Sequence, residues 1–188
     1  MNKKKVVKGE YGYINNQRKK VIIRTIFMYG ISLALFWIGI WSTGDKKNLL
    51  TVVAVLGCLP ASKSAVNMIM FLRAKGCSEG VKERIEKSCK SLPQLFDMLF
   101  TSYEKNYRIS HMIVKGKVVC GYTEDEKCDC TACEKHLDAL LKQGGCKGAT
   151  IKIYDDLENY CKGLENLEQQ EAEEANEDIM MNLLSISL

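Results

Sequence analysis

Two long apolar stretches stand near the start of the chain, and the first of them predicts a membrane-spanning helix. The 17 residues Thr25–Trp41 carry no charge and are apolar on every face of a helix. At about 1.5 Å per residue this helix is roughly 25 Å long, near the lower limit for crossing a bilayer. Residues 21–23 lengthen it, because Arg24 can extend its guanidinium to the headgroups. A buried helix of a soluble core is the alternative, and the uniform hydrophobicity argues against it.

The second stretch, Leu49–Leu72, predicts a second spanning helix after a short polar turn at residues 42–48. Pro60 can bend this helix, because proline removes a backbone donor. Lys63 interrupts it, and a lysine at mid-depth in a bilayer is costly. Either the helix is shifted so that Lys63 reaches the cytoplasmic headgroups, which we favour, or Lys63 faces a partner helix.

Small residues recur in these stretches at intervals of four, which aligns them on one face of each helix. The pairs are Ala54 with Cys58, Gly57 with Ala61, Ala61 with Ala65, and, in the first stretch, Gly30 with Ala34. Such faces let two backbones approach closely. We interpret them as the contact between the two helices of one hairpin, with self-association of the chain as the alternative.

The basic residues around the stretches predict an orientation. Eight Lys and Arg side chains precede Thr25 and four follow Leu72 as far as Arg84, whereas the turn between the two stretches holds only Lys46 and Lys47. The positive-inside rule therefore places both termini in the cytoplasm and the protein in the cell membrane with two spans. A cleaved signal peptide fits less well, because a second apolar segment follows. Export would also expose nine cysteines, an odd number, to an oxidising space.

From residue 77 onward the pattern is that of a water-soluble α/β domain. Helical spacing begins at residue 78, and Pro93 predicts the start of a second helix that carries four apolar residues: Leu95, Phe96, Leu99 and Phe100. Residues 107–114 and 118–122 predict two strands joined by a turn at Gly116. A helix over residues 131–142, a third strand over 149–154 and a last helix after Asp155 follow.

The fold class expected from this order is a membrane-anchored α+β chain. A two-helix transmembrane hairpin precedes a small cytosolic α/β domain, whose elements run helix, helix, strand, strand, helix, strand, helix, with about three strands. The predicted divisions are a basic N-terminal segment (1–20), the hairpin (21–72), the α/β domain (77–164) and an acidic tail with an apolar C-terminus (165–188). The last ten residues can dock on the domain, lie on the membrane or bind a partner.

Composition and charge narrow the partners. The chain is 46% hydrophobic and 27% charged, which excludes a disordered polymer. Residues 1–90 hold 17 Lys and Arg against 5 Asp and Glu, a net charge of +12, whereas residues 91–188 hold 10 against 18, a net charge of −8. The total of +4 is too small for a basic nucleic-acid tail, so we expect no nucleic-acid partner. The basic front end suits anionic lipid, and the lipid bilayer is the first partner expected.

One dense group of residues can bind a metal ion. Cys128, Cys130, Cys133 and His136 offer the thiol and imidazole ligands that zinc prefers. Only one Cys-x-x-Cys unit is present, so the usual pair of zinc knuckles is missing. The alternative is a purely structural role, in which a helix starts here and Cys133 faces the core, because this chain uses cysteine freely as a small apolar residue. A redox role for Cys130 and Cys133 is a further alternative. No other cofactor is expected.

A hydrolytic centre is a second hypothesis. His111, His136 and Lys152 are the catalytic candidates, with the carboxylates of Glu124, Asp125 and Glu126 as potential ligands of a divalent cation. No motif fixes their geometry, and the sequence has no phosphate loop, no nucleophile elbow and no dinucleotide fingerprint.

The preferred hypothesis is an integral membrane protein that presents a cytosolic α/β binding or regulatory domain at the inner membrane surface. The layout resembles that of small bacterial membrane proteins with two spanning helices and one cytosolic domain, a likeness of architecture that implies no activity. A protein partner, or self-association through the membrane helices, is expected. The alternatives are a membrane-tethered hydrolase or metal-dependent enzyme, and a small oligomeric pore or transport subunit that uses Lys63.

Overall fold

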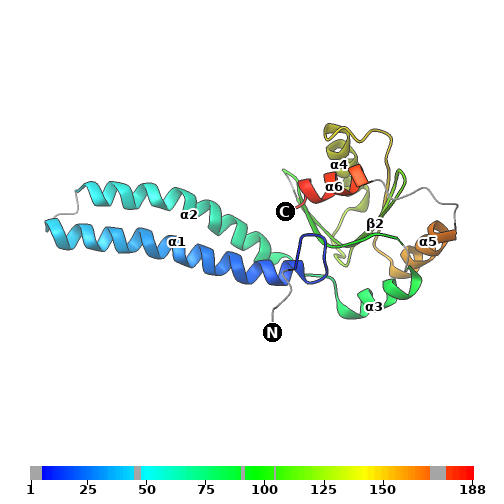
Figure 1. Cartoon of the computed structure of the whole chain (residues 1–188), viewed down its shortest axis with the longest axis horizontal. Coiled ribbons are helices and arrows are strands. Elements are labelled where there is room, and N and C mark those ends of the chain that lie inside the picture. Colours follow the sequence, from blue (N-terminus) through cyan, green and yellow to red (C-terminus); the bar gives the residue numbers. More distant parts are fainter. Residues whose placement is uncertain (1–5, 45–47, 90–91, 104, 170–176) are drawn as a thin grey trace. The chain divides into compact units, whose positions relative to one another are not determined.

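The computed structural model describes residues 6–44, 48–89, 92–103, 105–169 and 177–188. The chain consists of two long apolar helices followed by a small mixed four-stranded sheet with helices (Figure 1). These elements form two compact units. Residues 14–75 make the first, and residues 1–13 together with 76–188 make the second.

The first unit is a hairpin of α1 (Tyr13–Thr43) and α2 (Leu49–Arg73). Both helices are long and apolar enough to cross a membrane, judged by length and composition. The helix α1 begins eight residues before the predicted start at residue 21. Asn48 caps α2, because its side-chain oxygen accepts a hydrogen bond of 2.8 Å from the backbone N–H of Thr51.

Small and hydroxylated residues form the contact between the two helices. A Cβ atom added at Gly57 would lie 2.8 Å from the Ser32 hydroxyl, so the glycine is needed for this close approach. The hydroxyls of Thr25 and Ser64 are buried and lie 2.8 Å apart in a hydrogen bond that joins α1 to α2. Lys63 is exposed on α2 and does not enter this contact.

The Arg18 side chain of α1 forms hydrogen bonds with the C-terminal end of α2. Arg18 donates from Nε to the carbonyl of Phe71 at 3.1 Å and from Nη2 to the carbonyl of Ala74 at 2.5 Å. These carbonyls belong to the last turn of α2, which has no intrahelical donors left for them. The positive charge also interacts favourably with the negative end of the helix dipole.

The second unit is a sheet with helices on both faces. Its elements are α3 (Glu79–Ser88), β1 (Gln94–Thr101), β2 (Asn106–Lys115), β3 (Val118–Tyr122), α4 (Cys130–Gln143), β4 (Thr150–Tyr154), α5 (Leu157–Gln169) and α6 (Glu177–Ile186). The strands lie in sequence order; β1, β2 and β3 are antiparallel neighbours, and β4 is parallel to β3. The α4 helix therefore makes the crossover that a parallel pair requires.

Each face of the sheet has its own core. The helices α4 and α6 bury Leu137, Leu141 and Leu183 against one face, which we call the α4/α6 face. The helices α3 and α5 cover the other face, which we call the α3/α5 face (Figure 1). Ile85 of α3 and Tyr160 of α5 are fully buried there. Strands covered on both sides carry apolar residues at successive positions, and the alternation typical of a one-sided sheet is lost.

The predicted helix over residues 93–100 is wrong, and this segment is β1. Six consecutive residues, 95–100, are buried because both faces of the strand are covered. A short apolar run of this kind fits a two-sided strand and a buried helix equally well by its spacing. The sheet therefore has four strands where about three were expected, and the order of the first elements is helix, strand, strand, strand.

Segments from both ends of the described chain pair with the outer edge of β1. The N–H of Phe96 donates to the carbonyl of Gly9 at 2.8 Å, and the N–H of Leu188 donates to the carbonyl of Leu99 at 2.8 Å. Lys8 also donates to the carbonyl of Ser187. Of the three roles open to the last ten residues, docking on the domain is the one found. The acidic part of the predicted tail (165–188) falls partly on residues 170–176, outside the described residues.

Candidate functional site

Three cysteines gather where α4 begins. Cys128 lies in the loop, where its N–H donates to the Asp125 carbonyl at 2.9 Å, and Cys130 is the first residue of the helix. Asp129 between them is the N-cap and accepts a hydrogen bond of 3.0 Å from the N–H of Ala132. Cys133 completes the first turn of the helix, where its N–H donates to the Asp129 carbonyl at 2.9 Å. The capped turn therefore holds three cysteines within six residues of the sequence.

The three thiols differ in exposure. Cys133 is fully buried in the core of the α4/α6 face, and Cys128 and Cys130 are half-buried against the same core. The Cys133 and Cys130 thiols and the Thr123 hydroxyl are the neighbouring groups that lower the pKa of Cys128. We call Cys128 and these three neighbours the thiol cluster.

These contacts separate the acidities of the three groups. The hydrogen bond from Cys133 is the main reason why the pKa of Cys128 falls to about 7. The same bond, together with burial, raises the pKa of Cys133. Burial raises the pKa of Cys130 to about 11, and the nearby Cys128 adds to the effect. Cys128 is therefore the most acidic of the three thiols.

The fourth predicted zinc ligand points elsewhere. The His136 ring lies 5.6 Å from the Tyr107 ring, centroid to centroid, and its Nε2 is 3.3 Å from the carbonyl oxygen of Thr101. The side chain is thus held at the end of β1 and not beside the thiols. Within the described ranges, no group of three or more His, Cys, Asp or Glu residues is arranged to hold a metal ion. Zinc binding by the cysteines stays a prediction.

His111 is a buried, neutral residue on the opposite face of the sheet. Its Nδ1 lies 2.7 Å from the hydroxyl of Tyr160, and its ring packs 4.5 Å from the Phe96 ring. Complete burial lowers the pKa of His111 to about 3. Its Nε2 is buried without a hydrogen-bond partner in the described part of the chain. The sheet separates His111, on the α3/α5 face, from His136 on α4, so the two imidazoles do not share a centre.

The remaining hydrolytic candidates serve local structure. Lys152 on β4 is exposed, and its Nζ lies 3.7 Å from Oε1 of Glu134, which also accepts a 2.9 Å hydrogen bond from the N–H of Ile153. A carboxylate oxygen of Glu124 accepts a 3.0 Å hydrogen bond from the N–H of Ser78. The other two predicted carboxylates, Asp125 and Glu126, lie in the turn before Cys128, and Asp125 accepts a 3.2 Å hydrogen bond from the N–H of Lys127.

Sequence reasoning missed Thr123 as a member of the thiol cluster. Its hydroxyl donates to the Arg108 carbonyl at 2.7 Å and accepts from the N–H of Asp125 at 3.1 Å. These bonds tie the end of β3 to the loop that carries Cys128. The signal available in the sequence was a threonine directly after a predicted strand and five residues before Cys128. The chain turns at Asp125, and this turn places Cys128 near Thr123.

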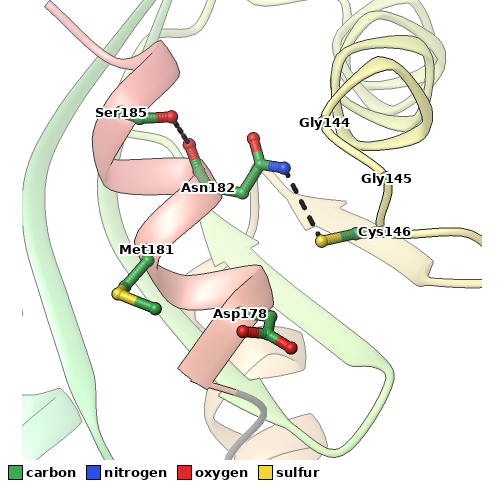
Figure 2. A pocket seen from close by; sticks show the side chains of 7 residues that line it. All are labelled: Gly144, Gly145, Cys146, Asp178, Met181, Asn182 and Ser185. Carbon is green, nitrogen blue, oxygen red and sulfur yellow. Dashed lines mark hydrogen bonds between the residues drawn. The ribbon is translucent and has the colours of Figure 1, made fainter.

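An open pocket lies between the end of α4 and α6. Its volume is about 550 Å³, and its lining residues are Gly144, Gly145, Cys146, Asp178, Met181, Asn182 and Ser185 (Figure 2). The side-chain amide of Asn182 points across it and donates to the sulfur of Cys146 at 3.6 Å. A Cβ atom at Gly144 would lie 1.7 Å from the Asn182 amide nitrogen, so this helix stop must be glycine for α6 to pack here.

Comparison with protein-family models, with curated proteins and with solved structures gives no match for this chain.

Proposed function

We propose that this chain is an integral membrane protein whose hairpin spans the cell membrane and holds the α/β unit at the cytoplasmic surface as a binding or regulatory domain. The observation that carries the proposal is the distribution of apolar side chains on the hairpin. Large apolar residues cover the outside of both helices, and Trp41 is 94% exposed, whereas the small residues Ala54 and Ala61 are buried between the helices. This is the reverse of the pattern in a water-soluble helical pair.

The buried share of each helix supports the same proposal. In the most apolar 18-residue stretch of each helix, only 17% is buried within the structure. A core helix of a soluble protein would bury most of such a stretch. In water the exposed Ile, Val, Leu, Phe and Trp side chains would form an apolar surface far larger than the few hundred Å² that soluble monomers tolerate. Lipid acyl chains provide the matching environment.

Polar groups in the hairpin are compatible with this setting. The buried hydroxyls of Thr25 and Ser64 satisfy each other, and Thr25 also donates to the Val21 carbonyl at 2.8 Å. Arg18 lies at the end of the hairpin that also carries Arg73 and Lys75. These cations support an orientation in which this end faces the cytoplasm, because basic residues concentrate on that side of a membrane.

The binding role is supported by the pocket of Figure 2. Its volume of about 550 Å³ lies in the range of small-ligand sites. Its lining offers a carboxylate at Asp178, an amide at Asn182 and a hydroxyl at Ser185 on one helix. Such a set of donors and acceptors suits a small polar ligand.

Extraction and thiol labelling test the membrane proposal. The full chain is expected to stay with membranes at alkaline pH and to be released by detergent. In intact cells an impermeant maleimide should label Ser42→Cys, at the exposed end of α1, but not Glu83→Cys on α3 or the wild type. Permeabilised cells should label Glu83→Cys as well. Release without detergent would refute membrane insertion, and labelling of Glu83→Cys in intact cells would refute the orientation.

A metal-dependent role is the second candidate, because Cys128, Cys130 and Cys133 lie within six residues at the start of α4 and offer thiol ligands. Thiolates are preferred zinc ligands. Metal analysis of the purified full chain is expected to find zinc, and Cys130→Ser should lower the zinc content. Cys161→Ser, which removes a half-buried cysteine of α5, is the matched control. Equal zinc content in the two variants would exclude the cluster as the site.

A further inference from the structure

We propose that Arg24 and Lys63 together bind the phosphate group of an anionic phospholipid in the cytoplasmic leaflet. The proposal rests on the proposed function, because it needs the hairpin to span the membrane, and it adds the chemical class of ligand that this part of the hairpin takes. A phosphodiester shares one negative charge between two oxygens, so it can accept hydrogen bonds from two cationic donors at once.

The contact between the two helices places both cations on one side of the hairpin. Thr25 of α1 faces Ser64 of α2, and their hydroxyls lie 2.8 Å apart. Arg24 directly precedes Thr25, and Lys63 directly precedes Ser64. In two antiparallel right-handed helices the residues that precede a facing pair project to the same side, because each is rotated by about 100° from the contact. The two side chains therefore leave the hairpin together and at nearly the same height.

The Arg24 guanidinium is already turned toward α2. Its Nε donates to the hydroxyl of Ser64, the residue that follows Lys63, at 3.4 Å. This contact uses one of the five N–H donors that a guanidinium carries. Lys63 is exposed, and its ammonium group has three donors. An anion between the two side chains can therefore accept hydrogen bonds from both.

The two helices carry no countercharge for this pair. Neither α1 nor α2 contains Asp or Glu, whereas together they contain six Lys and Arg residues. Two like charges at the border of the hydrocarbon region are costly unless an anion neutralises them. A zwitterionic headgroup brings its own positive charge, so it compensates the pair less well than a headgroup with net negative charge.

The pair lies at the depth of the cytoplasmic headgroups when the hairpin spans the membrane. Seventeen uncharged residues, 25–41, follow Arg24 on α1, and fourteen, 49–62, precede Lys63 on α2. At 1.5 Å per residue these stretches measure about 25 Å and 21 Å, against a hydrocarbon core of about 30 Å. Both side chains are long enough to extend from this depth to the headgroup phosphates. Inorganic phosphate has similar oxygens but stays in water, so the lipid is the source that the depth supports.

Lipid binding to the full chain in micelles of an uncharged detergent tests the proposal. Native mass spectrometry follows a titration with phosphatidylglycerol and, separately, with phosphatidylcholine. The wild type should bind one phosphatidylglycerol about tenfold more tightly than phosphatidylcholine. Arg24→Gln and Lys63→Gln should each weaken the binding of phosphatidylglycerol about tenfold, which corresponds to the loss of one charge-assisted hydrogen bond. Equal affinity of the wild type for the two lipids would overturn the proposal.

Lys19→Gln and Arg73→Gln are the matched controls, because each removes one positive charge from the same helix as its counterpart. Lys19 is five residues before Arg24, a rotation of about 140° around α1, and so it projects to another side. Arg73 is ten residues beyond Lys63, about 15 Å along α2. Both controls should keep the affinity of the wild type. Losses as large as those of Arg24→Gln and Lys63→Gln would reveal unspecific charge attraction and refute the site.

Two further arms exclude a structural effect and a free anion. Lys63→Arg keeps the charge and should keep the affinity that Lys63→Gln loses, and circular dichroism checks that the helices of each variant are intact. Equal losses in the two Lys63 variants would contradict the site. Inorganic phosphate in about hundredfold excess should leave the lipid bound, and displacement would assign the pair to a free anion and not to lipid.

The outcome is separable from that of the proposed function. Extraction at alkaline pH tests membrane insertion without reference to any lipid class. A chain that resists extraction but shows no preference for phosphatidylglycerol would refute the phosphate site alone, whereas a chain released without detergent would refute the membrane hairpin on which the site depends.

Discussion

The buried imidazole of His111 makes the α/β unit sensitive to acid above the range in which carboxylates titrate. In the folded state the ring is fully buried and its pKa is about 3, because burial disfavours the charged form. In the unfolded chain the pKa returns to about 6.5. Below that value the unfolded state binds a proton that the folded state does not, so this contribution to stability is complete above pH 6.5 and is lost progressively as the pH falls toward 3.

The size of the effect follows from the two pKa values. Between them the free energy of unfolding falls by about 1.4 kcal/mol for each pH unit. From pH 7.5 to pH 5.0 the loss is about 2 kcal/mol, since the slope develops fully only below pH 6.5. That is a large fraction of the stability of a typical small domain.

The perturbation that removes this slope is the double variant His111→Phe with Tyr160→Phe. Replacing both partners of the 2.7 Å hydrogen bond avoids leaving the Tyr160 hydroxyl buried without a partner. Urea unfolding of the full chain in micelles, followed by circular dichroism at several pH values, gives the free energy at each pH. The double variant should lose about 2 kcal/mol less than the wild type between pH 7.5 and 5.0.

His136→Gln is the matched control, because it removes the other histidine of the chain and leaves His111 in place. It should keep the acid sensitivity of the wild type. Equal pH dependence in the wild type and the double variant would refute the reasoning, because it would mean that His111 is not buried in its neutral form.

Three further substitutions test the packing, each by the unfolding of the full chain in micelles. Gly57→Leu should destabilise the hairpin by about 1–3 kcal/mol, seen in tryptophan fluorescence, whereas Gly30→Leu should not, because a Cβ there meets nothing within 4 Å. Leu183→Ala should cost the α/β unit about 2–5 kcal/mol, and the exposed Met181→Ala on the same helix less than 0.5 kcal/mol or so. Asp129→Ala should cost about 1 kcal/mol through the lost N-cap of α4. Equal effects within the glycine pair or within the α6 pair would contradict the described contacts.

The elements that were predictable from sequence are those with a regular period or a distinctive end. The β2–β3 hairpin around Gly116 and the α4 helix with its glycine stop appear close to the predicted ranges. The segment 93–100 was assigned the wrong element, because its apolar run reflects helices on both faces of the sheet, a tertiary fact that no local period contains. The docking of the last residues also depends on distant partners, as in the bond between Leu188 and Leu99.

The candidate site was predictable in part for the same reason. Cys128, Cys130 and Cys133 are close in sequence, so the start of α4 alone places them in one loop and one helical turn. His136 is one turn beyond Cys133, but the Thr101 carbonyl and the Tyr107 ring draw it to the end of β1. The face of the sheet on which His111 lies follows from the register of β2 with β1 and β3. That register cannot be derived from the sequence alone.

The pairing of Gly9 and Leu188 with β1 has a consequence for solubility during synthesis and storage. A sheet edge with unpaired N–H and C=O groups can pair with strands of other molecules, and this pairing leads to aggregation. Here Gly9 and Leu188 of the same chain cover that edge, so protection is complete only after Leu188 has left the ribosome. Variants shortened so that Leu188 is lost should therefore be recovered as aggregates more often than those extended between α1 and α2.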